Sequence, residues 1–226
     1  MTSSLREKAV GNWNTPFRDL FRRMVEETDA SNADYEAVLC NGTRHTIPFF
    51  GDAERATVLT MGVNPSGEEF GATRLWRISK EEPEYLLYLL GRLKNYFALR
   101  VPAYEPFFPI WEQALKALGH SYQRDAAHID ISPRPLMSMR SIRTLKDNGK
   151  QQEYDRCRTL FEKALISDAK WLFELLGVLP ALKCILMAGN LIVSPPQLDL
   201  WIRRHAPAGW SFHSAPYTSG PPCQYR

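Results

Sequence analysis

The feature that most constrains the fold is the segment TVLTMGVNPS, residues 57–66. Its apolar members are Val58, Leu59, Met61 and Val63. Such a nearly continuous run of β-favouring residues is typical of a strand buried on both faces of a parallel sheet. The run breaks into Asn-Pro-Ser-Gly, a turn signal that ends the strand. Gly62 lets another group approach the backbone closely, and Asn64 stands at the carboxyl end, where open α/β sheets bind ligands.

Three further apolar segments are predicted to be strands, and helical patterns separate them. The strands are expected at residues 124–131, 182–188 and 210–213, and the helices at residues 15–28, 86–97, 108–118, 153–177 and 198–205. Strands that alternate with helices form βαβ units, so the chain is expected to be α/β with a short, mostly parallel central sheet. We also predict a hairpin around Asn41-Gly42, and a break in the longest helical pattern at Asp168, which can cap a second segment.

Size and composition limit the possible classes of protein. The 226 residues suffice for one domain, which we expect to span residues 1–226, with residues 1–50 as a helical or irregular extension packed on it. Hydrophobic residues make up 44% of the chain, as in globular proteins. No stretch approaches the roughly 18 apolar residues of a membrane helix, and the first residues lack the apolar core of a secretory signal. The net charge of +3 is a slight tilt toward anionic partners.

The four cysteines are scattered along the chain, at Cys40, Cys157, Cys184 and Cys223. No two of them have the close spacing of a zinc or iron–sulfur site, and four thiols in a chain of this size do not indicate a disulfide framework. We therefore expect no metal, no cofactor and no membrane partner, and a cytoplasmic location.

Polar residues follow each predicted strand. They are Asn64, Asp130 with Ser132, Asn190, and His213 with Ser214. Because the carboxyl ends of parallel strands lie at one edge of a sheet, these groups are expected to converge on a single cleft. Each also has a purely structural interpretation: Asn64 can bond to the backbone of its own turn, Asp130 can pair with an arginine, and His213 can be a hydrogen-bonded core histidine. The basic stretch at residues 134–146 is by default a solvated face.

Two short motifs make the chain resemble the uracil-DNA glycosylase superfamily. GVNPS, residues 62–66, resembles the first active-site motif, especially its GINPG and GMNPG forms in the mismatch-specific and single-strand-selective branches. FHSAP, residues 212–216, looks like the second motif, usually HPSP or a close variant. TRLW, which ends in Trp76, is similar to a segment downstream of the first motif in the mismatch-specific branch, and the strand before Gly189 is similar to a strand-then-glycine step of the same fold. Order and placement agree over about residues 55–220.

The resemblance implies a three-layer α/β/α sandwich that hydrolyses the bond joining uracil, or a related deaminated base, to deoxyribose in DNA. The base must first be swung out of the duplex into a pocket. Bond cleavage then leaves an oxocarbenium-like sugar and an anionic base. Asn64, carried over from the first motif, would orient the attacking water, although an amide is no strong base. His213, from the second motif, would donate a hydrogen bond to the base oxygen as charge develops.

The remaining site residues carry the roles of base binding and DNA binding. The residues expected around the base are Gly62, Val63, Phe70, Asp130 and Trp76, with Phe70 the best candidate for stacking and Trp76 the reserve. The residues expected to contact DNA are Ser66, Arg134, Arg140, Arg143, Ser214 and Tyr217. Among these, Tyr217 is the candidate wedge that fills the vacated stack. The expected partner is single- or double-stranded DNA that contains a damaged base, bound by a monomer.

Three departures from the family pattern stand out. The family commonly has an asparagine at the end of the second strand to read the uracil amide edge, and Asp130 occupies this place here. A carboxylate accepts hydrogen bonds but does not donate them, so it would take N3–H and repel O4. Either burial keeps the carboxyl protonated, or the preferred base differs from uracil, or the register is off by a residue or two. The second motif also lacks proline after His213, and the cysteine pattern excludes the iron–sulfur branches.

Two alternatives to a glycosylase remain. The chain can be a catalytically inactive relative that binds nucleic acid with the same fold and basic edge. It can also be an α/β enzyme that uses the same cleft for free nucleotides or other small molecules, because the fold alone permits this.

Overall fold

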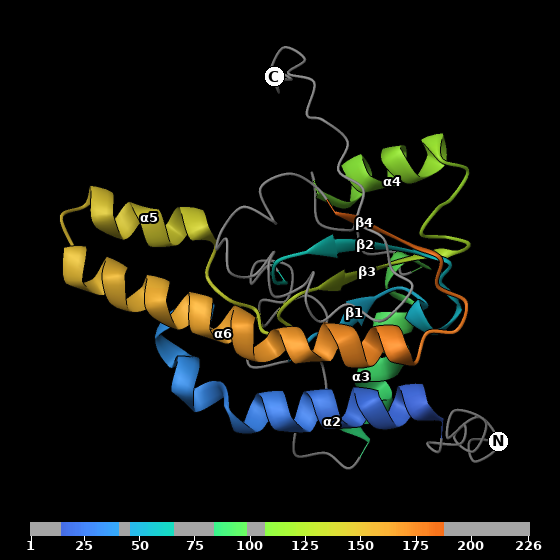
Figure 1. The fold of residues 1–226 in the computed structure, drawn as a ribbon, viewed down its shortest axis with the longest axis horizontal. Helices are drawn as coiled ribbons and strands as arrows, with labels where there is room; N and C mark the ends of the chain where they lie inside the picture. Colours follow the sequence, from blue (N-terminus) through green and yellow to red (C-terminus); the bar gives the residue numbers. More distant parts are fainter. Residues whose placement is uncertain (1–14, 41–45, 66–83, 99–106, 188–226) are drawn as a thin grey trace, which may run out of the picture.

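The computed structural model describes residues 15–40, 46–65, 84–98 and 107–187. In this part of the chain, helices surround a small mixed sheet with the strand order β1-β3-β2-β4 (Figure 1). The strands are β1 (Phe49–Phe50), β2 (Val58–Gly62), β3 (Ala126–Asp130) and β4 (Cys184–Met187). β2 is parallel to β3 and to β4, whereas β1 is antiparallel to β3. The α/β class predicted from the sequence is therefore confirmed, with one antiparallel edge strand added.

The strand predicted from the apolar run lies at the centre of the sheet. All five residues of β2 are buried, and β2 pairs with a parallel neighbour on each side. The predicted strands at 124–131 and 182–188 are confirmed as β3 and β4. The fourth, at 210–213, lies outside the described residues. Burial on both faces explains why β2 is a continuous apolar run and not an alternating one.

Five α-helices and three short 3-10 helices occur in the described residues. They are α2 (Pro16–Ala30), η1 (Asn32–Val38), η2 (Ala53–Arg55), α3 (Tyr85–Lys94), η3 (Tyr96–Ala98), α4 (Phe107–Ala117), α5 (Met139–Asp147) and α6 (Gln151–Gly177). The predicted start of the first helix is confirmed, because Thr15 caps α2 by accepting a hydrogen bond from the Arg18 N–H at 3.3 Å. The predicted short helix at 198–205 lies outside the described residues.

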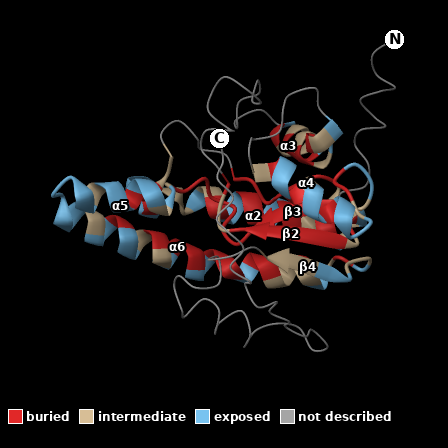
Figure 2. Ribbon diagram, turned by 90° about the horizontal axis from the view of Figure 1, so that it is seen from above, coloured by how far each residue is buried: buried red, intermediate tan, exposed pale blue. Residues whose placement is uncertain are grey.

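Helices pack on both faces of the sheet at β1. Phe49 and Phe50 are adjacent in a strand, so their side chains leave the sheet on opposite sides. Phe49 contacts Phe17 of α2 with ring centroids 5.4 Å apart, and Phe50 contacts Phe108 of α4 at 5.3 Å. Figure 2 shows buried residues concentrated on β2 and β3 and on the sides of the helices that face them, whereas β4 is only partly buried. The three-layer sandwich and the single domain over residues 1–226 stay predictions.

One local prediction is wrong. The pattern at 153–177 was expected to break at Asp168, yet α6 is one continuous helix and Asp168 is buried within it. Its carboxylate is held by Arg134, so a residue that resembles a cap serves as a buried ion-pair partner instead. The hairpin turn predicted at Asn41-Gly42 lies outside the described residues.

No helix among the described residues is both long enough and apolar enough to cross a membrane.

Asp125 closes the turn that leads into β3. Its Oδ2 lies 2.8 Å from His120 Nδ1, and its Oδ1 accepts a hydrogen bond from the Ser121 N–H at 3.1 Å. The Asp125 carbonyl accepts a hydrogen bond from the Thr57 N–H at 2.9 Å, which ties the start of β3 to the start of β2. The hydrogen bond from His120 holds the pKa of Asp125 below its usual value. The turn thus sets the register at the amino end of both central strands.

This turn predicts a pH-dependent contribution to stability. Because the pKa of Asp125 is lowered in the folded state, its carboxylate stabilises the fold above the usual pKa of 3.8, and this is lost as the pH falls through the folded pKa. Asp125→Asn is expected to lower the free energy of unfolding by about 0.5–1 kcal/mol near pH 7, a small value because both side chains are partly exposed. Urea unfolding near pH 7 and pH 3 measures the difference, which should shrink at the lower pH. A difference that does not change with pH would contradict this account.

Candidate active site at the carboxyl ends of the central strands

The carboxyl ends of β2 and β3 lie side by side. Gly62 pairs with Asp130 in the parallel register. Past the strand ends, the Ile131 N–H donates to the Gly62 carbonyl at 3.1 Å, and the Ser132 N–H donates to the Val63 carbonyl at 3.0 Å. The structure therefore brings together three of the predicted site segments, at Gly62, Asn64 and Asp130, at the edge where α/β sheets bind ligands.

Gly62 allows the Asp130 carboxylate to lie directly against the β2 backbone. A Cβ atom at position 62 would overlap Asp130 Oδ1 and would lie 3.0 Å from His128 Nε2. The absence of a side chain at Gly62 thus leaves space for the side chains of Asp130 and His128. The Asp130 side chain is 4% exposed, so the carboxylate stands inside the protein surface.

His128 belongs to this cluster and was not predicted from the sequence. It stands two residues before Asp130, so both side chains lie on the same face of β3. His128 Nε2 lies 3.5 Å from Asp130 Oδ1. Its Nδ1 lies 2.7 Å from Thr60 Oγ1, which in turn lies 2.6 Å from the Tyr122 hydroxyl. The sequence did contain a signal for His128: it is a histidine within the apolar stretch AAHID, two residues before an aspartate.

Aromatic side chains surround the His128 ring. The ring centroids of Phe107, Phe108 and Phe50 lie 5.1, 5.3 and 5.8 Å from that of His128. Burial also raises the pKa of Tyr122, well above its ordinary value, so its phenol keeps its proton. The four polar groups from Tyr122 to Asp130 therefore form a chain in an apolar setting, where hydrogen bonds are strong and unpaired groups are costly.

Asn64 is held by the loop that follows β3. Its amide Nδ2 donates to the Leu136 carbonyl at 2.8 Å and to the Pro65 carbonyl at 3.1 Å. Both amide hydrogens are thus directed at backbone oxygens, which fixes the orientation of the side chain. The Oδ1 atom is then the part of the amide that can interact with a water molecule, and it does so as an acceptor.

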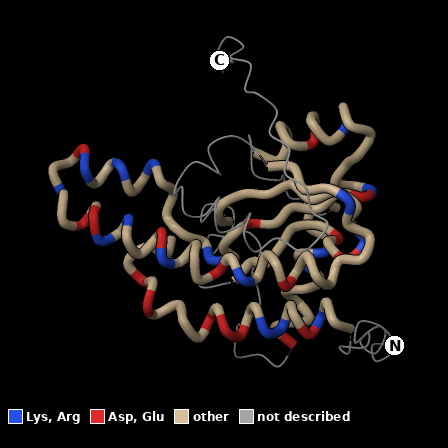
Figure 3. The backbone as a smooth tube through the Cα atoms, viewed as in Figure 1, with Lys and Arg blue, Asp and Glu red and all other residues tan. Residues whose placement is uncertain are grey.

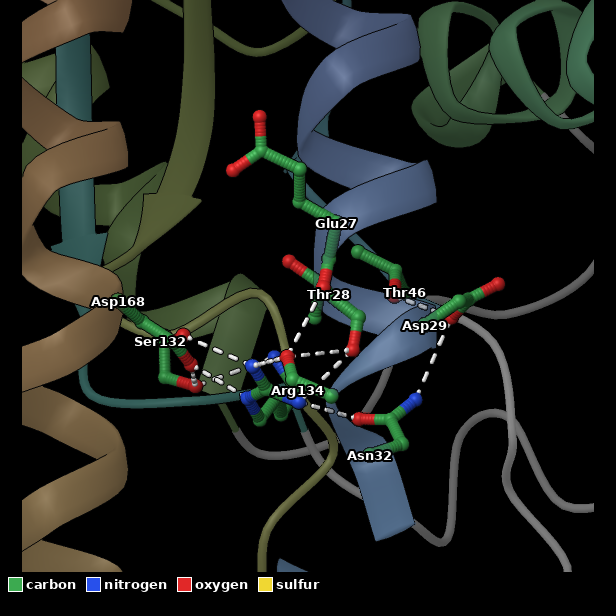
Figure 4. Close-up of polar contacts among 9 residues, drawn as sticks. Glu27, Thr28, Asp29, Asn32, Thr46, Ser132, Arg134 and Asp168 are labelled. Atoms are coloured by element: carbon green, nitrogen blue, oxygen red, sulfur yellow. Dashed lines mark hydrogen bonds and ion pairs between the residues drawn. The ribbon is translucent and has the colours of Figure 1, made fainter. Parts of the chain in front are cut away.

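Arg134 anchors that loop from inside the protein, and its predicted role as a DNA contact is wrong. Its guanidinium donates to Asp168 through Nε at 2.9 Å and Nη2 at 3.2 Å, and to Ser31 Oγ through Nη2 at 2.8 Å. Nη1 donates to the Thr28 carbonyl at 2.9 Å and to Asn32 Oδ1. Figure 4 shows this arginine enclosed between α6 and the end of α2. A 2% exposed guanidinium whose N–H groups are already bonded does not reach a phosphate.

The Arg134 network joins parts of the chain that are far apart in sequence. Burial raises the pKa of Asp168, and the guanidinium of Arg134 and the hydroxyl of Ser132 act against this rise. The ring of Tyr35 in η1 lies 4.6 Å from the Arg134 guanidinium carbon. The backbone of the loop is also fixed, because the Met137 N–H donates to the Val38 carbonyl at 2.7 Å. Leu136, the hydrogen-bond acceptor of Asn64, therefore sits in a firmly held loop.

Arg140 and Arg143, in contrast, are exposed on α5. Figure 3 shows basic residues recurring along this helix, which begins directly after the loop of Arg134 and carries Lys146 near its end. Ser138 caps α5 by accepting a hydrogen bond from the Ser141 N–H at 3.0 Å. Both side chains reach solvent, so the phosphate contacts predicted for Arg140 and Arg143 stay predictions.

Other predicted site residues lie outside the described residues. These are Ser66, Phe70, Trp76, His213, Ser214 and Tyr217, together with Asn190. Val63 is described: it is partly buried and packs against the hydrophobic core. Within the described ranges, no group of three His, Cys, Asp or Glu side chains is placed to hold a metal ion.

Comparison with protein-family models, with curated proteins and with solved structures gives no match to this chain.

Gly62→Ala tests the close approach at the site. The new methyl group would overlap the Asp130 carboxylate, so we expect a loss of about 1–3 kcal/mol in the free energy of unfolding, as for an overpacked core position. Gly91→Ala in α3 is the matched control, because nothing lies within 4 Å of the new methyl group there. The control is expected to gain about 0.5–1 kcal/mol, as alanine favours a helix interior. Urea unfolding of both variants measures the contrast, and equal effects would contradict the packing described.

Asp168→Ala tests the Arg134 network. Removal of the carboxylate leaves the buried guanidinium without its counter-charge, so we expect a loss of about 3–5 kcal/mol in unfolding free energy. Glu162→Ala, in the same helix, removes the partly exposed partner of the exposed Arg158 and should cost less than about 1 kcal/mol. Thermal and urea unfolding measure both variants. A small effect of Asp168→Ala would mean that Arg134 does not depend on this ion pair.

Proposed function

We propose that this protein is a DNA glycosylase that hydrolyses the N-glycosidic bond of a deaminated base in DNA. One observation supports the proposal above the others: Gly62, Asn64 and Asp130 meet at the carboxyl ends of two adjacent parallel strands. The resemblance of the first motif implies a site formed by both strand ends at one edge of the sheet. A different strand order would have separated Gly62 and Asn64 from Asp130.

In the proposed reaction, Asn64 orients the attacking water and does not take its proton. The bond between C1′ and the base nitrogen breaks, and its electron pair leaves with the base. The water oxygen bonds to C1′, and its proton passes to solvent or to the departing base. The amide suits the orienting role, because its N–H groups bind the Leu136 and Pro65 carbonyls and its Oδ1 can accept from water. An amide gives less acceleration than a carboxylate base would.

The other roles belong to the proposal as well. His213 donates a hydrogen bond to the base oxygen, Phe70 or Trp76 stacks on the extruded base, and Tyr217 fills the gap in the stack. Exposed Arg140 and Arg143 supply phosphate contacts on α5. We further propose a monomer in the reducing cytoplasm, in keeping with the free thiols of Cys157 and Cys184.

Excision assays with two matched asparagine variants test the function. Oligonucleotides that carry uracil, hypoxanthine or xanthine, single- and double-stranded, are incubated with the protein, and abasic sites are then cut with alkali. We expect wild-type cutting that falls by about 10²–10³-fold in Asn64→Ala, because water orientation is lost. Asn95→Ala, which removes an exposed asparagine at the end of α3, should keep wild-type activity. His213→Ala should also lose activity.

The same experiment separates the alternatives. DNA binding that weakens with salt, without any cutting, would indicate an inactive nucleic-acid-binding relative. Cutting unaffected by Asn64→Ala would contradict the proposed mechanism. If the protein neither binds nor cuts DNA, DNA is excluded as the partner. That result would favour an enzyme that acts on free nucleotides or small molecules.

A further inference from the structure

The segment that ends η1 lies along the loop that carries Leu136. An isolated antiparallel bridge joins Leu39 to Leu136. On one side of this bridge the Cys40 N–H donates to the Pro135 carbonyl at 2.8 Å, and on the other side the Met137 N–H donates to the last carbonyl of η1 at 2.7 Å. The early part of the chain therefore pairs with the loop that orients Asn64.

This pairing leaves the Leu136 carbonyl to side-chain donors. Leu39 and Leu136 stand opposite each other without exchanging backbone hydrogen bonds, as in every second pair of an antiparallel ladder. Two side chains donate to the Leu136 carbonyl instead: Asn64 through Nδ2 at 2.8 Å and Cys40 through Sγ at 3.2 Å. A carbonyl oxygen has two lone pairs, so it can accept from both donors at once.

The thiol restricts the way in which the Asn64 amide can meet this carbonyl. An S–H group is a weak donor, so at 3.2 Å it takes little strength from the Asn64 bond. It nevertheless occupies the second lone pair, in a place that solvent can approach because Cys40 and Asn64 are both partly exposed. A water molecule in place of the thiol would be a stronger donor and would compete with the amide for the carbonyl.

We propose that Cys40 is a positioning residue for Asn64. By holding one lone pair of the Leu136 carbonyl, the thiol fixes the direction of the Asn64 amide and, with it, the direction in which Oδ1 meets a water molecule. The proposal rests on the glycosylase function, in which Asn64 orients the attacking water. It also makes the segment up to Cys40 a working part of the site, whereas residues 1–50 were predicted only to pack on the domain.

Two substitutions at Cys40 and one at a second thiol test this role. Cys40→Ala removes the donor, and Cys40→Ser keeps a donor on the same Cβ atom. Cys157→Ala is the matched control, because the Cys157 thiol of α6 also donates to a backbone carbonyl, that of Ala37 in η1, at 3.7 Å. Asn64 does not use that carbonyl: its amide donates to Leu136 and Pro65.

Hydrogen exchange of the Asn64 side-chain amide measures the positioning without any catalysis. The signals are followed in proton–nitrogen NMR spectra of the full chain and are assigned by their loss in Asn64→Ala. We expect Cys40→Ala to speed this exchange about two- to fivefold, the effect of losing one weak hydrogen bond. Cys40→Ser and Cys157→Ala should keep the wild-type rate. An unchanged rate in Cys40→Ala, or an equal increase in Cys157→Ala, would overturn the proposal.

Excision kinetics measure the consequence for catalysis. The substrate is whichever of the uracil, hypoxanthine and xanthine oligonucleotides the wild type cuts. We expect Cys40→Ala to lower kcat about two- to fivefold and to leave KM unchanged, because orienting the water acts on the chemical step. Cys40→Ser should restore kcat. An effect on KM alone, or a Cys40→Ser protein as slow as Cys40→Ala, would overturn the proposal.

The two measurements separate failure of this proposal from failure of the glycosylase function. Faster amide exchange in Cys40→Ala alone, in a protein that cuts none of the oligonucleotides, would support the positioning of Asn64 by Cys40 and overturn the glycosylase function. Wild-type exchange in Cys40→Ala, in a protein whose cutting depends on Asn64, would overturn the role of Cys40 and leave the glycosylase function intact.

Discussion

The parallel pairing of β2 with β3 is the constraint on which the rest of the described structure depends. β2 is buried on both faces and has a parallel partner on each side, so its path is fixed along its whole length. Because Gly62 pairs with Asp130, the polar residues that follow the two strands must emerge together. The register is set at the opposite end, where the Asp125 carbonyl binds the Thr57 N–H. A slip by one residue would turn His128 and Asp130 away from Thr60 and Gly62.

The sequence predicted the elements whose pattern is local. The apolar run at β2, the capped start of α2 and the strands β3 and β4 follow from residue periodicity and turn signals. Gly62 and Asn64 were placed correctly at a strand end, because a buried strand that stops at Asn-Pro has few other interpretations. The partnership of Gly62 with Asp130 needed only the further assumption that the two strands are neighbours.

The sequence did not reveal the long-range partnerships of charged side chains. Arg134 lies in a basic stretch and was therefore predicted to be a surface residue. Asp168 was predicted to cap a helix. Each is buried only because the other is present, 34 positions away, and no local pattern carries this information. His128 was overlooked for a related reason: a polar residue in an apolar strand gains its meaning from Thr60 on the neighbouring strand. The hydrogen bonds of buried polar groups are properties of the tertiary structure.

The anchoring of the loop after β3 has a consequence for the order of folding. Arg134 bonds to the Thr28 carbonyl, 106 positions earlier in the chain, and to Asp168, 34 positions later. Contacts of such separation require large loops to close, and this entropic cost delays them relative to local helices. The loop that orients Asn64 therefore takes its final form only when α2, η1 and α6 have docked. Partly assembled chains can contain the sheet without the ordered edge at Asn64, so this edge exists only in the completed molecule.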